Sequence, residues 1–348
     1  MIKSLEINNY KGIQNFKLDN LNRINIFVGN NNSGKTSLLE AGYIGMKDNY
    51  MGAMTVLQNR NLNPMARTME TLFRDMDTNN KISIKLKTSS VISTETEISL
   101  STDSNIVPIN IPNENGIQTQ EDKKFVINKN GNKAYYNFAL LNRGNGLIEP
   151  VINIEFKNIN GKYLNVNSGD IYFISPKTRT NGNFANELRE QIKSRNEKKK
   201  ILEELQLFDP KIEDIIVDGI NIEVYLKGVD KPLPIQALGA GSFTVLEMAS
   251  IFGREKIKNI FIDEIEDGLH IQSMEIIAKY LSKTMEQKPD LQLFITTHST
   301  EIIKLITKHQ IDKNIVSAYR IYNKNDRTQV VEYNEDLLDT LEEGWEIR

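Results

Sequence analysis

The sequence predicts an α/β fold with a mixed central sheet, and three observations support that prediction. The first is an apolar run, Ile24–Val28, which leads through a glycine-rich loop into a helix-like segment starting near Lys35. The second is a pair of later apolar runs, 259–262 and 293–297, each followed by polar or charged side chains. The third is a series of short alternating segments between these parts, which is typical of strands. Together they indicate a sheet fold with a β-rich insertion after the glycine-rich loop.

Two short segments precede the first strand of that sheet. Residues 2–8 and 16–18 alternate apolar and polar positions, which predicts an N-terminal antiparallel β lobe formed by a hairpin. Lys11 falls in the turn of this hairpin. It is either a solvated turn residue or a phosphate or ribose contact beside the glycine-rich loop, and both interpretations stay open.

The glycine-rich loop reads GNNNSGKTS and meets the P-loop pattern G-x-x-x-x-G-K-[ST]. Its glycines let the backbone curl so that N–H groups point at phosphate oxygens, and the N-terminus of the next helix adds partial positive charge. Lys35 should reach the β- and γ-phosphates of a nucleotide, and the Thr36 hydroxyl should hold Mg²⁺. A turn that merely joins a strand to a helix is the alternative, and this context makes it the weaker one. The expected phosphate-binding residues are Gly29, Asn30, Asn31, Asn32, Ser33, Gly34, Lys35, Thr36 and Ser37.

Helical spacing continues to about residue 50 and again over 51–75, after which the pattern changes. Alternating segments separated by Asn, Gly, Ser and Pro clusters predict an antiparallel β region. We therefore divide the chain into a first core part (1–50), a helical and β-rich insertion (51–165) and a second core part (166–348). The predicted strands of the insertion are 81–87, 95–100, 123–128, 133–140 and 151–156, with a loop at 104–122.

The second core part begins with an apolar run, 170–176, which predicts a return to the central sheet. A helix is expected over 186–207. Its basic run, Arg195 and Lys198–Lys200, is either a solvated face or a contact with a phosphate backbone. A strand pair is expected next, at 212–217 and 220–226.

A small-residue turn, Gly239–Ser242, then opens a segment with the spacing of an amphipathic helix to about residue 252. Backbone amides at a helix N-terminus form an anion site. The signal is weak by itself, because small residues begin many helices.

The run NIFIDE at 259–264 places two carboxylates at the end of a strand. Active-site groups of open parallel sheets gather at that edge. Asp263 is placed to organise Mg²⁺ through water, and Glu264 to orient and activate an attacking water. The alternative is an acidic pair that only keeps the strand end hydrated. A helix is expected from near Ile271.

His298 follows the second of these strand ends, in the run LFITTHS. A lone histidine is usually structural, but this one lies where a γ-phosphate would be expected. His309 has no such context and is expected at the surface, and His270 is either a surface residue or a dimer contact. A hairpin of 315–323 and 328–333 and a short helix at 335–341 close the chain.

Composition limits the classes of function. The chain of 348 residues has a net charge of −3, so no overall basic surface announces nucleic-acid binding. It has no cysteine and three histidines, which excludes disulfides, a thiolate nucleophile and imidazole-rich metal sites. The sequence contains no apolar run of about 18 residues and no signal-peptide core, so we expect a cytoplasmic protein without membrane contact.

These motifs together resemble the RecF/SMC-like branch of the ABC-type ATPases, and within it the ATPase part of OLD (overcoming lysogenization defect) proteins and related anti-phage ATPases. The opening IKSLEINNYKGIQNFKL is similar to the N-terminal hairpin of that branch, and GNNNSGKTS to its Walker A loop. FIDEIEDGLH resembles its Walker B motif and D-loop, and TTHS its His switch. LGAGS departs from the LSGGQ signature of membrane transporters. The candidate Q-loop region, DIYFISPKTRT, has no clear matching Gln.

The resemblance implies an ABC-type ATPase that binds and hydrolyses ATP with Mg²⁺. Two copies would enclose two ATP molecules head to tail, so we expect a homodimer or a larger even oligomer. Glu264 would be the general base, His298 would sense the γ-phosphate, and Asp263 would help to hold Mg²⁺. Each ATP would also contact the partner's signature turn, formed by Gly239, Gly241 and Ser242.

The resemblance also suggests a partner. About fifty residues follow His298, too few for the Toprim nuclease of full-length OLD proteins, so a separate nuclease or other effector is expected in an anti-phage role. The alternative is a RecF-like DNA-repair ATPase, which would need a basic groove. A protein that holds nucleotide only as a structural ligand is a weaker alternative, and the sequence does not exclude GTP.

Overall fold

The computed structural model describes residues 1–47, 51–63, 65–89, 93–100, 117–142, 148–157, 171–176, 182–310, 312–324 and 327–333. The predicted helix at 335–341, positions 104–116 of the predicted loop and positions 177–180 of the candidate Q-loop region lie outside these residues. Among the helices that are described, none is both long and apolar enough to cross a membrane.

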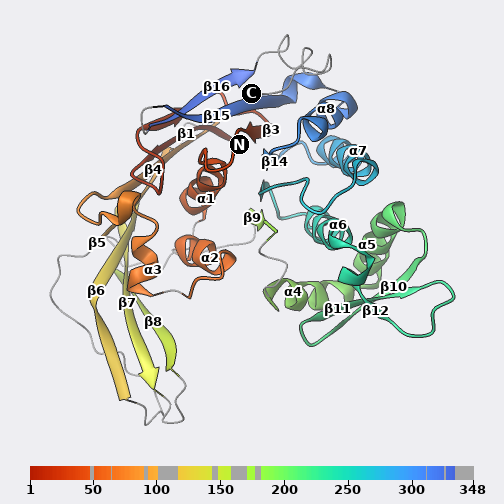
Figure 1. Cartoon of the computed structure of the whole chain (residues 1–348), viewed down its shortest axis with the longest axis horizontal. Coiled ribbons are helices and arrows are strands. Elements are labelled where there is room, and N and C mark those ends of the chain that lie inside the picture. Colours follow the sequence, from red (N-terminus) through yellow and green to blue (C-terminus); the bar gives the residue numbers. More distant parts are fainter. Residues whose placement is uncertain are drawn as a thin grey trace.

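A six-stranded mixed sheet forms the centre of the molecule (Figure 1), as predicted. Five strands run parallel and the edge strand β16 runs antiparallel to β15. The predicted closing hairpin is therefore part of this sheet, because β15 also pairs with β3. In spatial order the strands are β16 (Arg327–Tyr333), β15 (Val316–Lys324), β3 (Ile24–Val28), β14 (Gln292–Thr297), β13 (Asn259–Ile262) and β9 (Ile171–Ile174).

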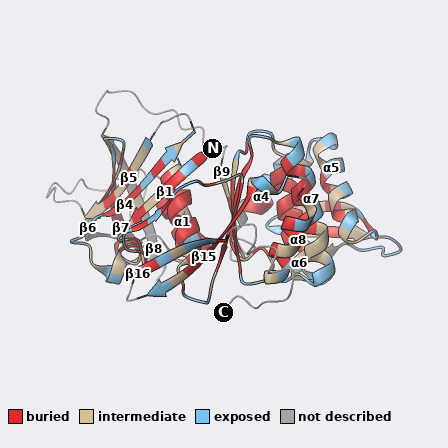
Figure 2. Ribbon diagram, turned by 90° about the horizontal axis from the view of Figure 1, so that it is seen from above, coloured by how far each residue is buried: buried red, intermediate tan, exposed pale blue. Residues whose placement is uncertain are grey.

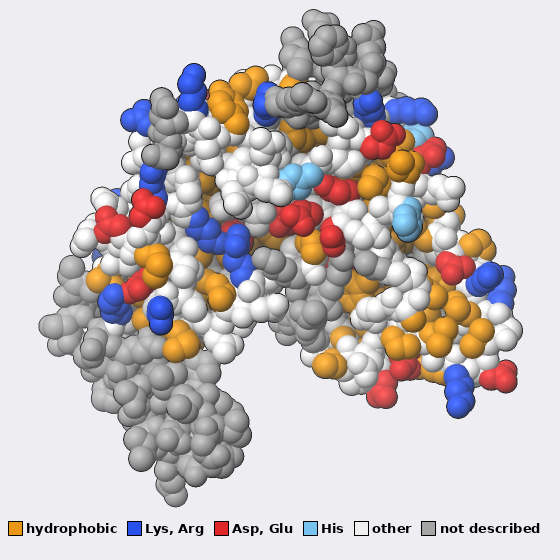
Figure 3. All heavy atoms as spheres, viewed as in Figure 1, with side chains coloured by type: hydrophobic (Ala, Val, Ile, Leu, Met, Phe, Trp, Pro, Cys, Tyr) orange, Lys and Arg blue, Asp and Glu red, His pale blue; other side chains and the backbone are white. Residues whose placement is uncertain are grey.

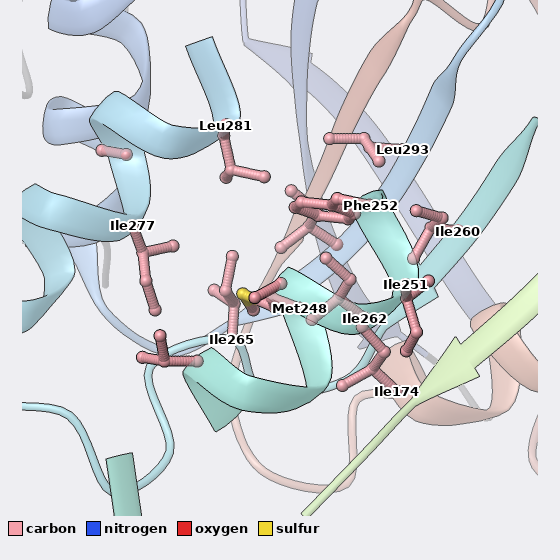
Figure 4. Packing of buried hydrophobic residues seen from close by; sticks show 14 of the residues in the cluster. Ile174, Met248, Ile251, Phe252, Ile260, Ile262, Ile265, Ile277, Leu281 and Leu293 are labelled. Atoms are coloured by element: carbon pink, nitrogen blue, oxygen red, sulfur yellow. The ribbon is translucent and has the colours of Figure 1, made fainter. Parts of the chain in front are cut away.

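The two faces of the central sheet carry different side chains. Strand periodicity places aliphatic residues such as Ile260 and Ile262 on one face, where they pack on helices. Figure 4 shows these residues in one packed cluster that also contains Met248 and Ile277. Aromatic side chains line the other face. Phe261 stacks between Phe173 and Phe294 with ring centroids 6.4 and 4.7 Å away. Both faces are therefore buried, which fits a parallel sheet.

A second, seven-stranded antiparallel sheet lies on the aromatic side of the central sheet (Figure 2). Its order shows that the insertion strands continue the N-terminal hairpin, because β4 pairs with β1. The predicted loop at 104–122 ends early, since β6 already begins at Ile117. The strands are β2 (Phe16–Leu18), β1 (Ile2–Asn8), β4 (Ile82–Thr88), β5 (Ser93–Leu100), β6 (Ile117–Lys129), β7 (Asn132–Asn142) and β8 (Ile148–Lys157).

Three helices and a 3₁₀ turn connect the two sheets on this side. Helix α1 packs against the strands β13 and β14 of the central sheet and against β4 and β5 of the antiparallel sheet. The bounds are α1 (Lys35–Met46), α2 (Gly52–Asn59), α3 (Ala66–Glu70) and a 3₁₀ turn at Arg74–Met76.

The opposite side of the central sheet is covered by helices and a three-stranded sheet. The prediction of a single helix over 186–207 is wrong, because the segment forms two helices. Ser194 caps the second helix by accepting a hydrogen bond from the Glu197 amide. The elements are α4 (Gly182–Ile192), α5 (Arg195–Phe208), β10 (Ile212–Asp218), β11 (Asn221–Leu226), β12 (Leu233–Pro234), a 3₁₀ turn (Ile235–Leu238), α6 (Ala240–Phe252), α7 (Ile271–Gln287) and α8 (Thr300–His309).

Helices α6 and α5 on this side each bear on an expectation from the sequence. Helix α6 is not amphipathic as predicted: from Phe243 onward its residues are buried, so it is a core helix. The three lysines of the basic run on α5 are paired, because Lys198 lies 2.7 Å from Asp214 and the two lysines after it contact Glu203 and Glu197. This favours the solvated-face interpretation over contact with a phosphate backbone.

Candidate functional site

The glycine-rich loop connects β3 to α1 and uses backbone conformations that few residues adopt. Gly34 caps α1 with φ 101°, and Asn32 has φ 61°, a value that asparagine tolerates better than most side chains. Gly29 has no room for a Cβ, because an atom there would lie 2.1 Å from the carbonyl oxygen of Ile321 on β15. The loop is therefore shaped by the sheet behind it as well as by its own sequence.

The hairpin β15–β16 also contacts this loop through side chains. Asn323 donates a hydrogen bond from Nδ2 to the carbonyl oxygen of Asn32 at 3.1 Å. Thr328 lies 3.2 Å from Asn323 Oδ1 and 3.4 Å from the carbonyl oxygen of Gly12. The hairpin thus bridges the glycine-rich loop and the turn that carries Lys11.

Lys35 lies inside the curve of the loop. Its Nζ donates hydrogen bonds to the carbonyl oxygens of Gly29 and Asn30 at 2.8 and 2.9 Å, and the residue is only 5% exposed. Burial lowers the pKa of Lys35, and the nearby carboxylates of Asp263 and Glu264 oppose that shift. The ammonium is held where it can meet a phosphate oxygen.

The carboxylate of Asp263 lies against the start of α1. Its Oδ1 accepts hydrogen bonds from the hydroxyls of Thr36 at 2.9 Å and of Thr296 at 2.6 Å. Burial raises the pKa of Asp263, and these two hydrogen bonds oppose the rise. The oxygens of Asp263 and Thr36 fit Mg²⁺, which takes oxygen ligands and is usually held by one or two protein groups together with substrate phosphates. No cluster of three or more His, Asp or Glu suited to a metal occurs within the described residues.

Glu264 adopts an uncommon backbone conformation with φ 51°. The hydroxyl of Thr296 accepts a hydrogen bond from its amide at 2.8 Å, and so holds the turn after β13. A left-handed conformation at a residue other than glycine costs energy and is often found at functional sites. Here it directs the chain sharply after Asp263, so that both carboxylates border the same cleft.

A cleft of about 630 Å³ brings most of the predicted residues together. It is lined by the loop 31–37, by Lys11 and Gly12, by Arg60, and by the strand-end residues Asp263, Glu264 and His298. Figure 3 shows basic side chains, acidic side chains and a histidine gathered at the centre of this face. The volume is that of an ordinary ligand pocket, and the polar lining suits a phosphate-rich ligand.

His298 is exposed at the end of β14. Its backbone N–H donates to Glu266 Oε1 at 2.5 Å, so the segment after β13 fixes the position of this turn. A hydrogen bond therefore joins the segment that carries Glu264 to the segment that carries His298.

The signature turn lies elsewhere. Within the described residues, neither Gly239, Gly241 nor Ser242 lines the cleft. Gly241 packs against the segment after β13, where a Cβ would lie 2.9 Å from Leu269. The three residues thus do not meet the glycine-rich loop within one chain.

Sequence reasoning missed Thr296, Glu40 and Arg60, which shape the site, and also Gly12 and Pro176, which line the cleft. Thr296 holds Asp263 and the Glu264 amide; its place beside His298 at a strand end was the available signal. Glu40 and Arg60 had none, because neither belongs to a recognisable pattern. Glu40 Oε1 accepts from Arg60 Nε and its Oε2 from Lys11 Nζ, each at 2.5 Å. Lys11 is thus an ion-paired residue at the edge of the cleft, and no longer a candidate for a solvated turn.

Comparison with known proteins gives one family. A family model described as "AAA domain, putative AbiEii toxin, Type IV TA system" matches residues 24–304, from the first central strand into α8. A protein of Helicobacter pylori described as "ATP/GTP phosphatase" is 25% identical over 355 aligned positions, which cover 92% of each chain. A protein of Methanocaldococcus jannaschii described as uncharacterized is 28% identical over 111 residues, 32% of this chain and 90% of its own length.

Solved structures show a similar fold. The head domain of an SMC protein bound to the C-winged helix domain of ScpA superposes with a TM-score of 0.52 at 12% identity, covering 97% of this chain and 99% of that one. An SMC head domain with an extended coiled coil, bound to the C-terminal domain of ScpA from Pyrococcus furiosus, gives 0.50 at 12% identity and covers 98% of both chains. At this identity the likeness concerns the fold alone, and it confirms the predicted P-loop fold of the ABC type.

Proposed function

The chain belongs to the family described as "AAA domain, putative AbiEii toxin, Type IV TA system" and is an ATPase with an SMC-head-like fold, and from this premise we propose that it works as a nucleotide-driven dimeric switch for a separate effector. One observation carries the proposal. Lys35, Thr36, Asp263, Glu264 and His298, which are scattered over the sequence, line a single cleft. That set supplies positioning and charge stabilisation, which is what phosphoryl transfer requires.

Each residue has a role in this proposal. The loop amides and Lys35 hold the β- and γ-phosphates, and Thr36 with Asp263 holds Mg²⁺, which neutralises phosphate charge when bound. Glu264 accepts a proton from the attacking water, since it borders the cleft beside Asp263. His298 contacts the γ-phosphate. Lys11 and Arg60 contact the rest of the phosphate chain or the ribose.

The position of the signature turn supports a dimer. Gly239, Gly241 and Ser242 begin a buried helix but do not line the cleft of their own chain within the described residues. Their amides reach a phosphate chain if a second copy presents them from outside. Two copies then enclose two nucleotides, and hydrolysis releases the contacts that depend on the γ-phosphate.

The effector part of the proposal rests on resemblance to OLD-type anti-phage ATPases, whose partner activity is a Toprim nuclease. The ATP-bound dimer would hold that separate protein inactive. Infection would trigger its release. A RecF-like role on DNA receives less support, because the three lysines of the basic run on α5 each lie near a carboxylate, which offsets their charge. The relative described as an ATP/GTP phosphatase suggests that both nucleotides serve as substrates.

Solution mass tests the switch. We would measure wild type, Glu264→Gln and Lys35→Met by light scattering, each with and without ATP and Mg²⁺. Glu264→Gln should keep nucleotide and form a dimer or larger even assembly only with ATP, while Lys35→Met should not respond. An unchanged mass of Glu264→Gln with ATP would reject the switch. Co-purification with the proteins encoded beside it tests the effector, and binding to none of them would reject that part.

A further inference from the structure

A buried carboxylate outside the predicted motifs organises the far end of the cleft. Glu40 lies on α1 four residues after Thr36, so the two side chains share a helix face and are separated by one turn, about 6 Å along the axis. Its side chain is 4% exposed and is not among the described residues that line the cleft.

Both oxygens of Glu40 are engaged by groups from other elements. Oε1 accepts a hydrogen bond from Arg60 Nε at 2.5 Å. Oε2 accepts from Lys11 Nζ at 2.5 Å and from the Tyr10 hydroxyl at 3.2 Å. Burial raises the pKa of Tyr10 well above its usual value and the charge of Glu40 raises it further, so this hydroxyl stays a donor.

The two cations come from loops that are far apart in sequence, and each loop fixes its backbone. Lys11 has φ 48° and its amide donates to the carbonyl oxygen of Leu72 at 2.9 Å. Arg60 ends α2, with its amide bonded to the carbonyl oxygens of Val56 and Leu57. Two like charges on separate loops repel each other, and a shared buried carboxylate is what holds them side by side.

The arrangement leaves donors directed at the cleft. Arg60 uses Nε for Glu40, and in the part of the chain that the structure describes no hydrogen bond engages the other N–H groups of its rigid guanidinium fork, which can bind a second anion. The side chains of Lys11 and Arg60 are 14% and 30% exposed, and both line the cleft. One carboxylate with two cations gives this end of the cleft a net charge of +1.

We infer that Glu40 is a positioning residue that sets Lys11 and Arg60 as one anion subsite, one helical turn beyond Thr36, for the α-phosphate of a bound nucleoside di- or triphosphate. The inference rests on the proposed nucleotide site and extends it. Because this subsite reads phosphate and not a base, it serves ATP and GTP alike. Glu40 touches no substrate atom and acts through the two cations.

The test compares Glu40→Gln with Glu97→Gln. Glu97 is a matched control, since it pairs with Lys81 on the antiparallel sheet and is not part of the cleft lining within the described residues. Glu40→Gln should weaken ADP binding and raise KM for ATP and for GTP about ten- to a hundredfold, as expected for disturbed hydrogen bonds to charged groups. Its kcat should stay within about threefold, because Lys35, Thr36, Asp263 and Glu264 are untouched. Glu97→Gln should behave as wild type.

Whether Glu40→Gln changes KM or kcat decides whether Glu40 acts in nucleotide binding or in the chemical step. A loss of kcat with unchanged KM, or wild-type ADP binding by Glu40→Gln, overturns the inference while leaving the nucleotide site intact. Arg60→Gln should raise KM alone, and its effect should shrink in the Glu40→Gln background, because coupled residues are not additive. If Glu40→Gln does not fold, Lys11→Gln and Arg60→Gln decide: wild-type ADP affinity in both overturns the inference. A wild-type protein that binds no nucleotide defeats the proposed function itself.

Discussion

Replacing Lys35 should abolish nucleotide binding and leave the stability of the fold nearly unchanged. Replacing it by methionine keeps an unbranched apolar stem and removes the ammonium. Without nucleotide, two hydrogen bonds from a charged group are lost, about 1.5–3 kcal/mol each. The cost of holding the ammonium away from water, also several kcal/mol, disappears with them. Since burial lowers the pKa of Lys35, the second effect is at least comparable, and the free energy of unfolding should change by no more than about 1–2 kcal/mol.

Adding nucleotide should raise the Tm of wild type and leave that of Lys35→Met unchanged. At a ligand concentration one hundred times Kd, wild type gains about 2.7 kcal/mol. For a chain of this size about 2 °C per kcal/mol is expected, so Tm should rise by about 5 °C with a non-hydrolysable ATP analogue and Mg²⁺. Lys35→Met should show no rise at the same concentration. Thermal unfolding followed by fluorescence measures both quantities.

Lys129 is the matched control. Its Nζ donates to the carbonyl oxygens of Gly45 and Lys47 at 2.9 and 2.8 Å, and the residue is 9% exposed, so its surroundings are close to those of Lys35. It does not line the cleft within the described residues. Lys129→Met should therefore keep the rise of about 5 °C. A nucleotide-induced rise in Lys35→Met, or its loss in Lys129→Met, would refute the reasoning.

Four further outcomes follow from the same geometry. Gly29→Ala should lower Tm and abolish nucleotide binding, because its Cβ would lie 2.1 Å from a backbone carbonyl of β15; Gly12→Ala, with no atom within 4 Å, should unfold at the wild-type Tm. Asp263→Asn should raise the Tm of the nucleotide-free protein, because burial raises the pKa of Asp263 and the fold disfavours its charged form; the gain should shrink as pH falls through that raised pKa and vanish below the ordinary aspartate pKa of the unfolded chain, where both states of the wild type are protonated. Glu264→Gln should reduce ATP turnover about 10²–10⁴-fold at unchanged affinity, compared by phosphate release and equilibrium binding. Wild type should gain stability relative to Lys35→Met as pH rises toward 10.5, because the folded protein, with its lowered Lys35 pKa, loses that proton before the unfolded chain does; urea midpoints across alkaline pH report the sign.

The central sheet and the edge that carries the candidate site could be predicted because they depend on local patterns. Apolar strands ending in Asp263, Glu264 and His298 must gather at one edge if the strands are parallel, and the glycine-rich loop fixes the strand beside them. Strand pairing between distant segments is different. Nothing in the alternation of residues 82–88 says that they pair with residues 2–8, because period-two patterns fix faces and not partners.

The missed features have similar causes. The break before α5 depends on one hydrogen bond from the Glu197 amide to Ser194, inside a segment whose apolar spacing continues across it. The contact between Glu40 and Arg60 joins a helix to a loop 20 residues later, and charged residues at such positions are usually solvated. Three-dimensional placement, and not residue type, makes them part of the cleft.

The contact between Gly29 and the carbonyl of Ile321 can form only after β15 has been synthesised. The contact between Asn323 and Asn32 spans 291 residues, so the glycine-rich loop leaves the ribosome long before the strand that shapes it. At about 5–20 residues per second, that interval is on the order of 15–60 s. During it the loop has no backing, and the nascent chain holds no finished phosphate cradle. The contacts that β15 makes with the glycine-rich loop therefore form late in synthesis, after Asn323 has emerged.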